Sequence, residues 1–370
     1  MPRSQMMIRR FLPLVFLAVV ACDTDKKPDQ PPAVPPPVPA DPTPNDVVPP
    51  VDAPKTADQD CVGPDATGTP KTHQWNGITW EENGSTLSWT GPARDAVVVG
   101  TVTDIKESSE ENLANLKAFI AWFKKNKVDM IIVDGDSGTT QAGIESALDV
   151  LAGAQVPVFV IIGNGEGRVV YKTAMAAIQQ RSPHVFDLVK VRRVHTPQAD
   201  FVSLPGYFNP AFIHAKDGCQ YHPADVEATG AIIKAAKSPV VLVSHGGPKQ
   251  SGQYGVDLTT EGNHVGDPDM IKLMAEHKVL FGIFGNIHEA GGHATNSDGS
   301  ELIPPKKMVD QLYLNPGPAD AVTWMMNDKS ESEGMAAIMT ISKGKASYEI
   351  LRRGGKAAVV AKAKTKKKGK

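Results

Sequence analysis

The chain has 370 residues, of which 41% are hydrophobic and 22% are charged, and its formal net charge is −2. This length and composition are ample for one large hydrophobic core. The near-balance of charge argues against a chain that binds nucleic acid through its overall charge. We expect the folded domain to cover residues 57–355, because the segments on either side lack the apolar residues that a core requires.

The N-terminus has the pattern of an export signal. Three arginines lie within the first ten residues, and the apolar stretch that follows over residues 11–20 is too short to span a bilayer. Val19-Val20-Ala21-Cys22 then matches the cleavage site of bacterial lipoproteins. We expect removal of residues 1–21 and lipidation of Cys22; the alternative is an ordinary secretory signal with Cys22 as a bystander. The pattern predicts a lipid-anchored, extracytoplasmic protein of the bacterial cell envelope, bound to a membrane through this lipid.

The segments that flank the predicted domain are of low complexity. Residues 22–56 are rich in Pro, Asp and Ala and cannot bury enough surface to offset the entropy of ordering, so we expect a disordered tether. Residues 356–370 are basic, and we expect a disordered, solvated tail. Contact of this tail with anionic lipid or a cell-wall polymer is the alternative.

Two cysteines remain once Cys22 is lipidated. Cys61 and Cys219 form an even pair in an oxidising compartment. We therefore predict a disulfide that links the start of the domain to a mid-chain loop; two free thiols are the alternative.

In chain order, the predicted elements begin with a β-hairpin over residues 77–89, with alternating apolar residues on both arms and Asn83-Gly84 at its turn. Apolar runs predict further strands over residues 96–102, 130–133, 157–162, 201–204, 240–243, 279–284, 312–314, 335–342 and 346–351. Apolar stripes with helical spacing predict helices that contain residues 113–123, 144–151, 169–178, 224–236 and 269–277. The segment 181–221 shows no clear pattern apart from its one strand, and a polar, glycine-rich loop is expected over residues 246–266.

Five of the predicted strands end abruptly in polar residues. The residues at these ends are Asp104, Asp136, Asn164, His245, and Asn286 together with His288. Taken alone, an Asp or His after an apolar run is more often a cap or turn residue than a ligand. Because open α/β sheets place their sites at the carboxyl ends of their strands, five such ends together predict a metal site assembled across a sheet.

In their order along the chain, these strand ends resemble the motifs of the calcineurin-like metallophosphoesterases, over residues 97–351. That family carries D-x-H, G-D-x-x-D, G-N-H-[DE], an apolar strand that ends in His, and G-H-x-H. The matching segments are Asp104-Ile105-Lys106, Gly135-Asp136, Gly163-Asn164-Gly165-Glu166, Ser244-His245-Gly246 and Gly285-Asn286-Ile287-His288. The resemblance implies an α/β fold in which a two-sheet β-sandwich is flanked by helices in four layers. It also implies two divalent ions that activate a water for attack on phosphorus.

The resemblance also implies which residues hold the metals. The ligands of the first metal map to Asp104, Lys106, Asp136 and His288, and those of the second to Asp136, Asn164, His245 and Asn286. Carboxylate and amide oxygens with imidazoles suit Mn²⁺, Fe or Zn²⁺.

Four positions depart from the family pattern, and one of them is Thr139, which stands where G-D-x-x-D has its second Asp. Lys106 stands where a ligand histidine is expected, and an ammonium has no lone pair and repels a cation. Asn286 replaces a second ligand histidine, and Gly165 replaces the histidine that assists the leaving group. We therefore expect one divalent metal or none, with the Lys106 ammonium placed between Asp104 and Asp136. A general acid would come from elsewhere, and the candidates are His264, Glu166 and His293.

Two functions are compatible with this pattern. The first is a membrane-tethered, metallophosphoesterase-like hydrolase that acts on a small phosphomonoester or phosphodiester with altered or single-metal chemistry. The second is a catalytically inactive family member, a pseudoenzyme that binds a ligand or a protein partner in the envelope. The survival of five strand-end ligands favours the first, and the changes at Lys106, Gly165 and Asn286 favour the second. A purely structural lipoprotein would leave those ligands unexplained, and no nucleic-acid partner is expected.

Overall fold

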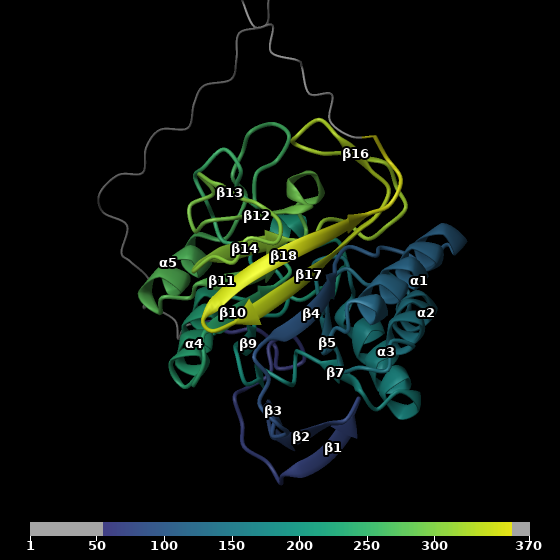
Figure 1. Ribbon diagram of the computed structural model, residues 1–370, viewed down its shortest axis with the longest axis vertical. Coiled ribbons are helices and arrows are strands. Elements are labelled where there is room, and N and C mark those ends of the chain that lie inside the picture. The colour runs from purple at the N-terminus through teal and green to yellow at the C-terminus, as the bar shows by residue number, and fades with distance from the viewer. Residues whose placement is uncertain (1–54, 357–370) are drawn as a thin grey trace, which may run out of the picture. The chain divides into compact units, whose positions relative to one another are not determined.

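Two large β-sheets lie against each other in the computed structural model, which describes residues 55–356, and helices cover their outer faces (Figure 1). The predicted signal peptide, Cys22, nearly all of the tether and the tail beyond residue 356 lie outside the described residues. Among the helices that are described, none has the length and apolar content needed to cross a bilayer.

The smaller of the two sheets has six strands in the order β18-β17-β4-β5-β6-β7. Its strands are β4 (Val97–Val102), β5 (Met130–Asp134), β6 (Val158–Ile161), β7 (Val185–Asp187), β17 (Met335–Ser342) and β18 (Lys345–Arg352). The first four are parallel, and α1 (Glu110–Lys125), α2 (Gln141–Ala152) and α3 (Arg168–Arg181) connect them. The closing hairpin β17–β18 adds to the sheet antiparallel to β4. The carboxyl ends of β4, β5 and β6 therefore meet at one edge.

The larger sheet has ten strands in the order β1-β2-β3-β8-β9-β10-β11-β14-β12-β13. Its strands are β1 (Lys71–Trp75), β2 (Ile78–Asn83), β3 (Thr86–Trp89), β8 (Arg193–His195), β9 (Asp200–Ser203), β10 (Val240–Ser244), β11 (Phe281–Phe284), β12 (His293–Thr295), β13 (Leu302–Ile303) and β14 (Leu312–Asn315). The central strands β9, β10, β11 and β14 are parallel, and α4 (Pro223–Lys234) and α5 (Pro268–Glu276) lie on this side of the molecule. Two 3₁₀ turns, η1 (Pro210–Phe212) and η2 (His288–Ala290), and a small ribbon of β15 (Trp324–Met325) and β16 (Glu331–Ser332) complete the elements.

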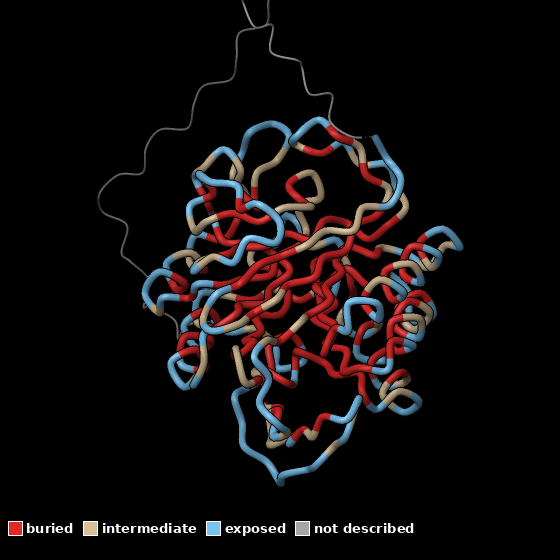
Figure 2. The backbone as a smooth tube through the Cα atoms, in the orientation of Figure 1, coloured by how far each residue is buried: buried red, intermediate tan, exposed pale blue. Residues whose placement is uncertain are grey.

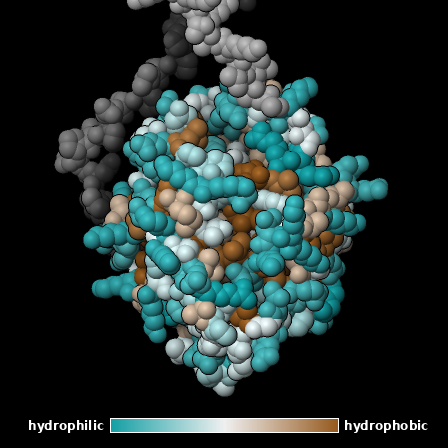
Figure 3. Space-filling view, in the orientation of Figure 1, coloured by the Kyte–Doolittle hydropathy of each residue, from teal (hydrophilic) through white to brown (hydrophobic). Residues whose placement is uncertain are grey.

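The core has two layers because the central strands are buried on both faces, as expected for parallel strands covered by helices (Figure 2). Alternate residues of β5 illustrate this arrangement. Met130 and Ile132 pack between the two sheets with residues such as Phe281 of β11. Ile131 and Val133 instead pack beneath the helices with residues such as Phe119 of α1. The face drawn in Figure 3 is mostly hydrophilic, with small apolar areas between the polar side chains.

The sandwich of two sheets flanked by helices that the resemblance implies is confirmed. The predicted hairpin at residues 77–89 corresponds to β2 and β3, and the predicted closing strands correspond to β17 and β18. Seven short strands were not predicted: β1, β7, β8, β12, β13, β15 and β16. Most of these have two or three residues, too few to show an alternating pattern, and β1 (KTHQW) is largely polar because it forms the exposed edge of its sheet.

A disulfide joins Cys61 to Cys219, the pair that the sequence predicts. Both residues are buried, and they are separated by 158 positions in the chain. Cys219 lies in the loop that connects η1 to α4, so the bond ties this loop to the beginning of the described domain.

Candidate functional site

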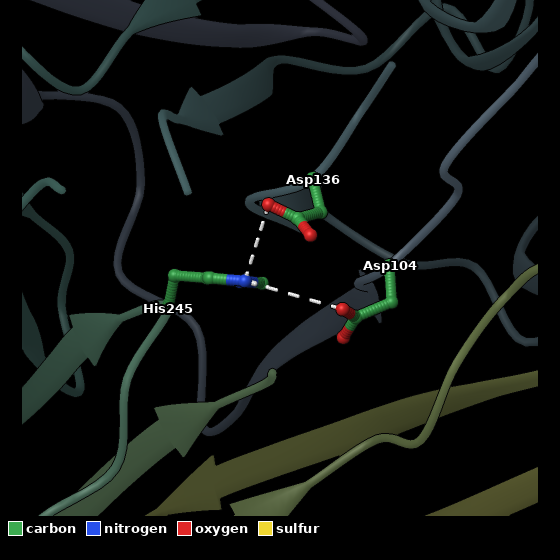
Figure 4. Close-up of side chains that lie close together, drawn as sticks. All are labelled: Asp104, Asp136 and His245. Atoms are coloured by element: carbon green, nitrogen blue, oxygen red, sulfur yellow. Dashed lines mark ion pairs between the residues drawn. The ribbon is translucent and has the colours of Figure 1, made fainter. Parts of the chain in front are cut away.

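The strand ends bring three ionisable side chains together at one edge of the sheets. Asp104 follows β4, Asp136 follows β5 and His245 follows β10, and all three are buried. Each offers one ligand atom, and these atoms lie within 4.8 Å of one another. Figure 4 shows the imidazole of His245 pointing at both carboxylates, with Nε2 at 3.3 Å from Asp136 Oδ1 and 3.9 Å from Asp104 Oδ1.

Lys106 lies between the two carboxylates. Its Nζ is 2.6 Å from Asp136 Oδ2 and 3.2 Å from Asp104 Oδ1. Burial alone would lower the pKa of Lys106, but the two negative charges outweigh it and hold that pKa above its ordinary value. Burial likewise opposes ionisation of both carboxyl groups, but Lys106 and the neighbouring histidines hold the pKa values of Asp104 and Asp136 below their usual range. The ammonium is therefore positively charged and in the place where the sequence analysis puts it.

The loop that carries Lys106 is fixed by the first turn of α1. The N-terminus of this helix is capped by Ser109, whose side chain accepts from the backbone N–H of Asn112. The buried Asn112 amide donates to the carbonyl oxygens of Ile105 and Glu107, at 2.8 and 3.1 Å. The backbone N–H of Lys106 itself donates to Asp136 O at 2.8 Å. The position of the ammonium is thus set by the backbone as well as by its ion pairs.

Four site residues adopt the left-handed backbone conformation, which side-chain-bearing residues rarely occupy. The φ angles are 53° for Asp104, 67° for Lys106, 52° for Asp136 and 62° for Asn286. Such a conformation costs about 1–2 kcal/mol for most residues and persists only where surrounding contacts enforce it. Asp and Asn tolerate it better than Lys does. Four residues in this conformation lie at three strand ends. The fold therefore positions these side chains at a cost in folding free energy.

His245 directs its Nε2 toward two oxygen acceptors. Its Nδ1 is 2.6 Å from the carbonyl oxygen of Asp134, which can only accept, so Nδ1 carries a proton. Its Nε2 faces Asn164 Oδ1 at 3.0 Å and Asp136 Oδ1 at 3.3 Å. The amide of Asn164 is oriented by donating its Nδ2 to Phe212 O at 2.8 Å, so its oxygen is the atom that faces His245. Three lone-pair donors therefore converge on one point, and a proton or a metal ion must lie among them.

His288 and Asn286 lie in the segment after β11, and both contact the site through hydrogen bonds to Asp104. His288 Nε2 is 3.0 Å from Asp104 Oδ1, and its ring lies 4.1 Å from the ring of Trp324. The backbone N–H of Asn286 donates to Asp104 Oδ2 at 3.0 Å, while its side-chain Nδ2 donates to the hydroxyl of Tyr207 at 2.9 Å. These two predicted ligands thus surround Asp104, outside the group formed by Asp136, Asn164 and His245.

Glu166 joins the loops that follow β5 and β6. It is fully buried, and its two oxygens accept backbone N–H groups from Asp136, Ser137 and Gly163. Burial and the charge of Asp136 raise the pKa of Glu166 to about 8. Because both oxygens point at the backbone, Glu166 positions Asp136 and does not reach bound substrate, although the sequence made it a candidate acid.

Replacing Glu166 with glutamine should destabilise the protein and loosen the metal-ligand loops. The new amide group would place a donor against backbone donors, and a buried polar group left without its partner costs about 1–3 kcal/mol. We expect a lower midpoint in urea denaturation and a lower metal content. The exposed Glu227 provides the control as Glu227→Gln. Equal midpoints for the two variants would contradict the role of Glu166.

A cavity of about 150 Å³ opens over Lys106. It is lined by Lys106, Asp136, Gly138, Thr139, Gly165 and His214. A Cβ at Gly165 would lie 2.9 Å from both carboxylate oxygens of Asp136, so the histidine that the family pattern places there does not fit unless Asp136 moves.

The other candidate acids lie away from this cavity. His264 pairs with Asp257, with Nδ1 at 2.8 Å from Oδ1, and does not line it. His293 Nε2 is 2.9 Å from the carbonyl oxygen of Tyr254 and lines a separate cavity with Arg352. His214, Tyr207 and Trp324 lie in segments without periodicity or family motifs, so the sequence alone assigns them no role.

Comparisons with known proteins identify the family. A family model described as calcineurin-like phosphoesterase matches residues 97–290, which is more than half of the chain. One solved structure is 15% identical with a TM-score of 0.50, and the match covers 70% of this chain and 100% of that chain. A dimetal phosphatase from Danio rerio is 11% identical with a TM-score of 0.45, and the match covers 69% and 98%. GAP50, the anchor in the inner membrane complex of Plasmodium, is 13% identical with a TM-score of 0.45, and the match covers 72% and 88%.

No curated protein matches the chain. At these identities the solved structures bear on the fold alone, and the family assignment depends on the matched family model and its extent. The chain belongs to the calcineurin-like phosphoesterase family.

Proposed function

We propose that this chain is a phosphoesterase in which the Lys106 ammonium takes the place of one of the two metal ions of its family. The observation that carries the proposal is the position of Lys106 Nζ, 2.6 Å from Asp136 and 3.2 Å from Asp104. A second cation cannot share the space between these carboxylates with an ammonium, so the residues present do not fit the first metal. The substrate class is a small phosphomonoester or phosphodiester.

The second metal position fits the residues that are present. Asp136 Oδ1, Asn164 Oδ1 and His245 Nε2 converge with their lone pairs, and the proton on His245 Nδ1 is held by a backbone carbonyl. These three residues would hold a single divalent ion of the Mn²⁺, Fe or Zn²⁺ type. Such an ion would supply Lewis-acid activation of the phosphoryl group.

The chain itself would supply positive charge at the phosphoryl oxygens. The side chain of Lys106 is 31% exposed and lines the cavity, while its ammonium pairs with the two carboxylates. Charge that develops on the phosphoryl oxygens during hydrolysis is stabilised by a fixed cation in a partly desolvated site. The side chain of His288, hydrogen-bonded to Asp104, keeps this carboxylate in place beside the ammonium.

The cellular setting that we propose depends on the N-terminal sequence. The lipoprotein-like pattern at Val19-Val20-Ala21-Cys22 and the Pro-rich segment after it support a domain held at a membrane of the cell envelope by a lipid on Cys22. An envelope location would give the domain access to small phosphorylated compounds outside the cytoplasm.

A second function is favoured by the surroundings of Gly165. The backbone N–H of Gly165 donates to Asp136 Oδ1 at 2.7 Å, and the carboxylate fills the space that a side chain there would need. The assisting histidine of the family is therefore absent, and the Asp136 carboxylate fills the space that its side chain would need. This observation favours a protein that binds a phosphorylated ligand or a protein partner without turnover.

Metal content and hydrolysis together test the proposal. After loading with Mn²⁺ or Zn²⁺ and removal of excess ion, elemental analysis should find about one metal per chain. The variant Asn164→Ala should lose this metal, and hydrolysis of bis(p-nitrophenyl) phosphate should fall with it. Bound metal without hydrolysis would favour the binding function. Absence of metal from both proteins would contradict the proposed second position.

A further inference from the structure

We propose that His214 donates a hydrogen bond to the phosphoryl group of a ligand bound in the cavity that it lines together with Lys106. The inference rests on the proposed function, since it adds a ligand-binding residue to the same site. It assigns a role to a residue that no family motif contains, and the role is hydrogen-bond donation without proton transfer.

The loop that carries His214 is fastened to the end of β6. The backbone N–H of His214 donates to Asn164 O at 2.9 Å, and the side chain of Asn164 donates to Phe212 O at 2.8 Å. Further along the loop, Gly218 pairs with Gly167, and Asp217 Oδ2 accepts the backbone N–H of Val169 at 3.0 Å. The histidine is therefore held beside the strand end that carries the metal-ligand candidate Asn164, although it lies 50 positions later in the chain.

The side chain of His214 is available to a ligand. It lines the cavity together with Lys106 and Gly165, and the residue is exposed. Within residues 55–356, His214 uses its backbone N–H for a hydrogen bond, whereas its imidazole forms none. An imidazole without a protein partner at the rim of a small cavity is free to donate to a ligand oxygen.

The residues around the cavity offer hydrogen-bond donors to an anion. Asp136 is the only carboxylate among the described lining residues, and Lys106 already pairs with it. Lys106, His214 and Thr139 also line the cavity, and each carries a group that can donate a hydrogen bond. A tetrahedral phosphoryl group presents several acceptor oxygens, so it can take hydrogen bonds from Lys106 and His214 at the same time.

Gly165 explains why the donor comes from this loop. The Asp136 carboxylate occupies the space next to its Cα, so a side chain at position 165 would require Asp136 to move. His214 lines the same cavity as Gly165. The chain thus places an imidazole at the cavity from a different segment than the family pattern does.

Calorimetric titration of the full chain with inorganic phosphate tests this inference. His214→Phe removes the donor and should weaken phosphate binding about tenfold, as expected for a hydrogen bond to a charged group. His214→Gln keeps a donor and should bind within about threefold of the unchanged chain. Lys216→Gln is the control, because Lys216 is exposed on the same loop and does not line the cavity.

The outcomes separate this inference from the proposed function. Equal phosphate affinity in the unchanged chain and His214→Phe would overturn the role of His214. The same conclusion would follow if His214→Phe and Lys216→Gln weakened phosphate binding equally. It would also follow if the unchanged chain bound no phosphate. Hydrolysis of bis(p-nitrophenyl) phosphate with a KM that His214→Phe leaves unaltered would overturn the inference while the proposed function stands. Phosphate binding that depends on His214 in a chain without hydrolysis would support the inference and contradict the hydrolase.

Discussion

Replacing Lys106 with methionine should lower the free energy of unfolding by roughly 3 kcal/mol in metal-free buffer, and divalent metal should restore most of this loss. The side chains of Asp104 and Asp136 are only 1% and 2% exposed, and the ammonium is within ion-pair distance of both. Removing one partner of a buried ion pair leaves uncompensated charge, which is among the more costly changes in a protein. Because Lys106 is 31% exposed, water can offset part of the cost.

Urea denaturation with EDTA and with Mn²⁺ measures this effect. Lys117→Met is the matched control, since Lys117 is exposed on α1 away from the site. We expect the Mn²⁺-dependent gain in midpoint to be larger for Lys106→Met than for the unchanged chain, because a metal can enter where the ammonium was. The double variant Lys106→His with Asn286→His should raise the metal content further. Metal content that stays the same in both site variants would show that Lys106 does not take the place of a metal.

The same variant should change how stability depends on pH. The pKa values of Asp104 and Asp136 lie below the unfolded-state value, which is about 3.9. Such groups contribute stability that is present above the unfolded pKa and is lost as pH falls through the lower folded pKa. Without Lys106 the buried carboxylates should bind protons at higher pH, so Lys106→Met should gain relative stability as the solution is acidified toward pH 4. A parallel pH profile for the two proteins would contradict this account.

Replacing Asp136 with asparagine should have the largest effect on activity. One oxygen of Asp136 accepts from Gly165 N–H at 2.7 Å and the other accepts from the Lys106 ammonium at 2.6 Å. An asparagine amide can satisfy only one of these donors and turns its NH₂ group toward the other. The variant should lose its metal, and its hydrolysis rate should fall by at least about 100-fold. This is the scale seen when one preorganised charge is removed from an active site.

Elemental analysis and kinetics with bis(p-nitrophenyl) phosphate provide the measurement for Asp136→Asn. Asp95→Asn serves as control, because Asp95 is exposed. Circular dichroism should show that both variants remain folded. Retention of metal by a folded Asp136→Asn protein would place the metal elsewhere than at Asp136, Asn164 and His245.

Sequence reasoning could predict the parts of the site that local patterns encode. Asp104, Asp136 and His245 each follow an apolar run, and the position of a residue at a strand end can be read directly from the sequence. The position of Lys106 between two carboxylates also followed from the motif order and from the cost of leaving buried charges unpaired. The layered fold was predictable for the same reason, since long apolar strands alternate with amphipathic helices.

The remaining site residues depend on contacts between distant segments. The amide of Asn286 is turned by Tyr207, which lies 79 positions earlier, and the ring of His288 rests on Trp324 from a loop with no motif. His214 reaches the cavity only because its loop is pinned to Asn164. Neither periodicity nor motif spacing encodes such pairings, and short polar strands such as β1 gain their stability from a neighbour and not from their own composition.

The disulfide between Cys61 and Cys219 connects the redox state of the surroundings to the geometry of the cavity. Cys219 lies five positions after His214, at the end of the loop that presents this histidine. In a reducing cytoplasm the two thiols would be separate, and the loop would lose its covalent attachment to the start of the domain. Closing so long a segment contributes on the order of 3–5 kcal/mol in the chain-entropy model. In the envelope location that we propose, a newly made chain would complete its proposed ligand-binding rim only after export.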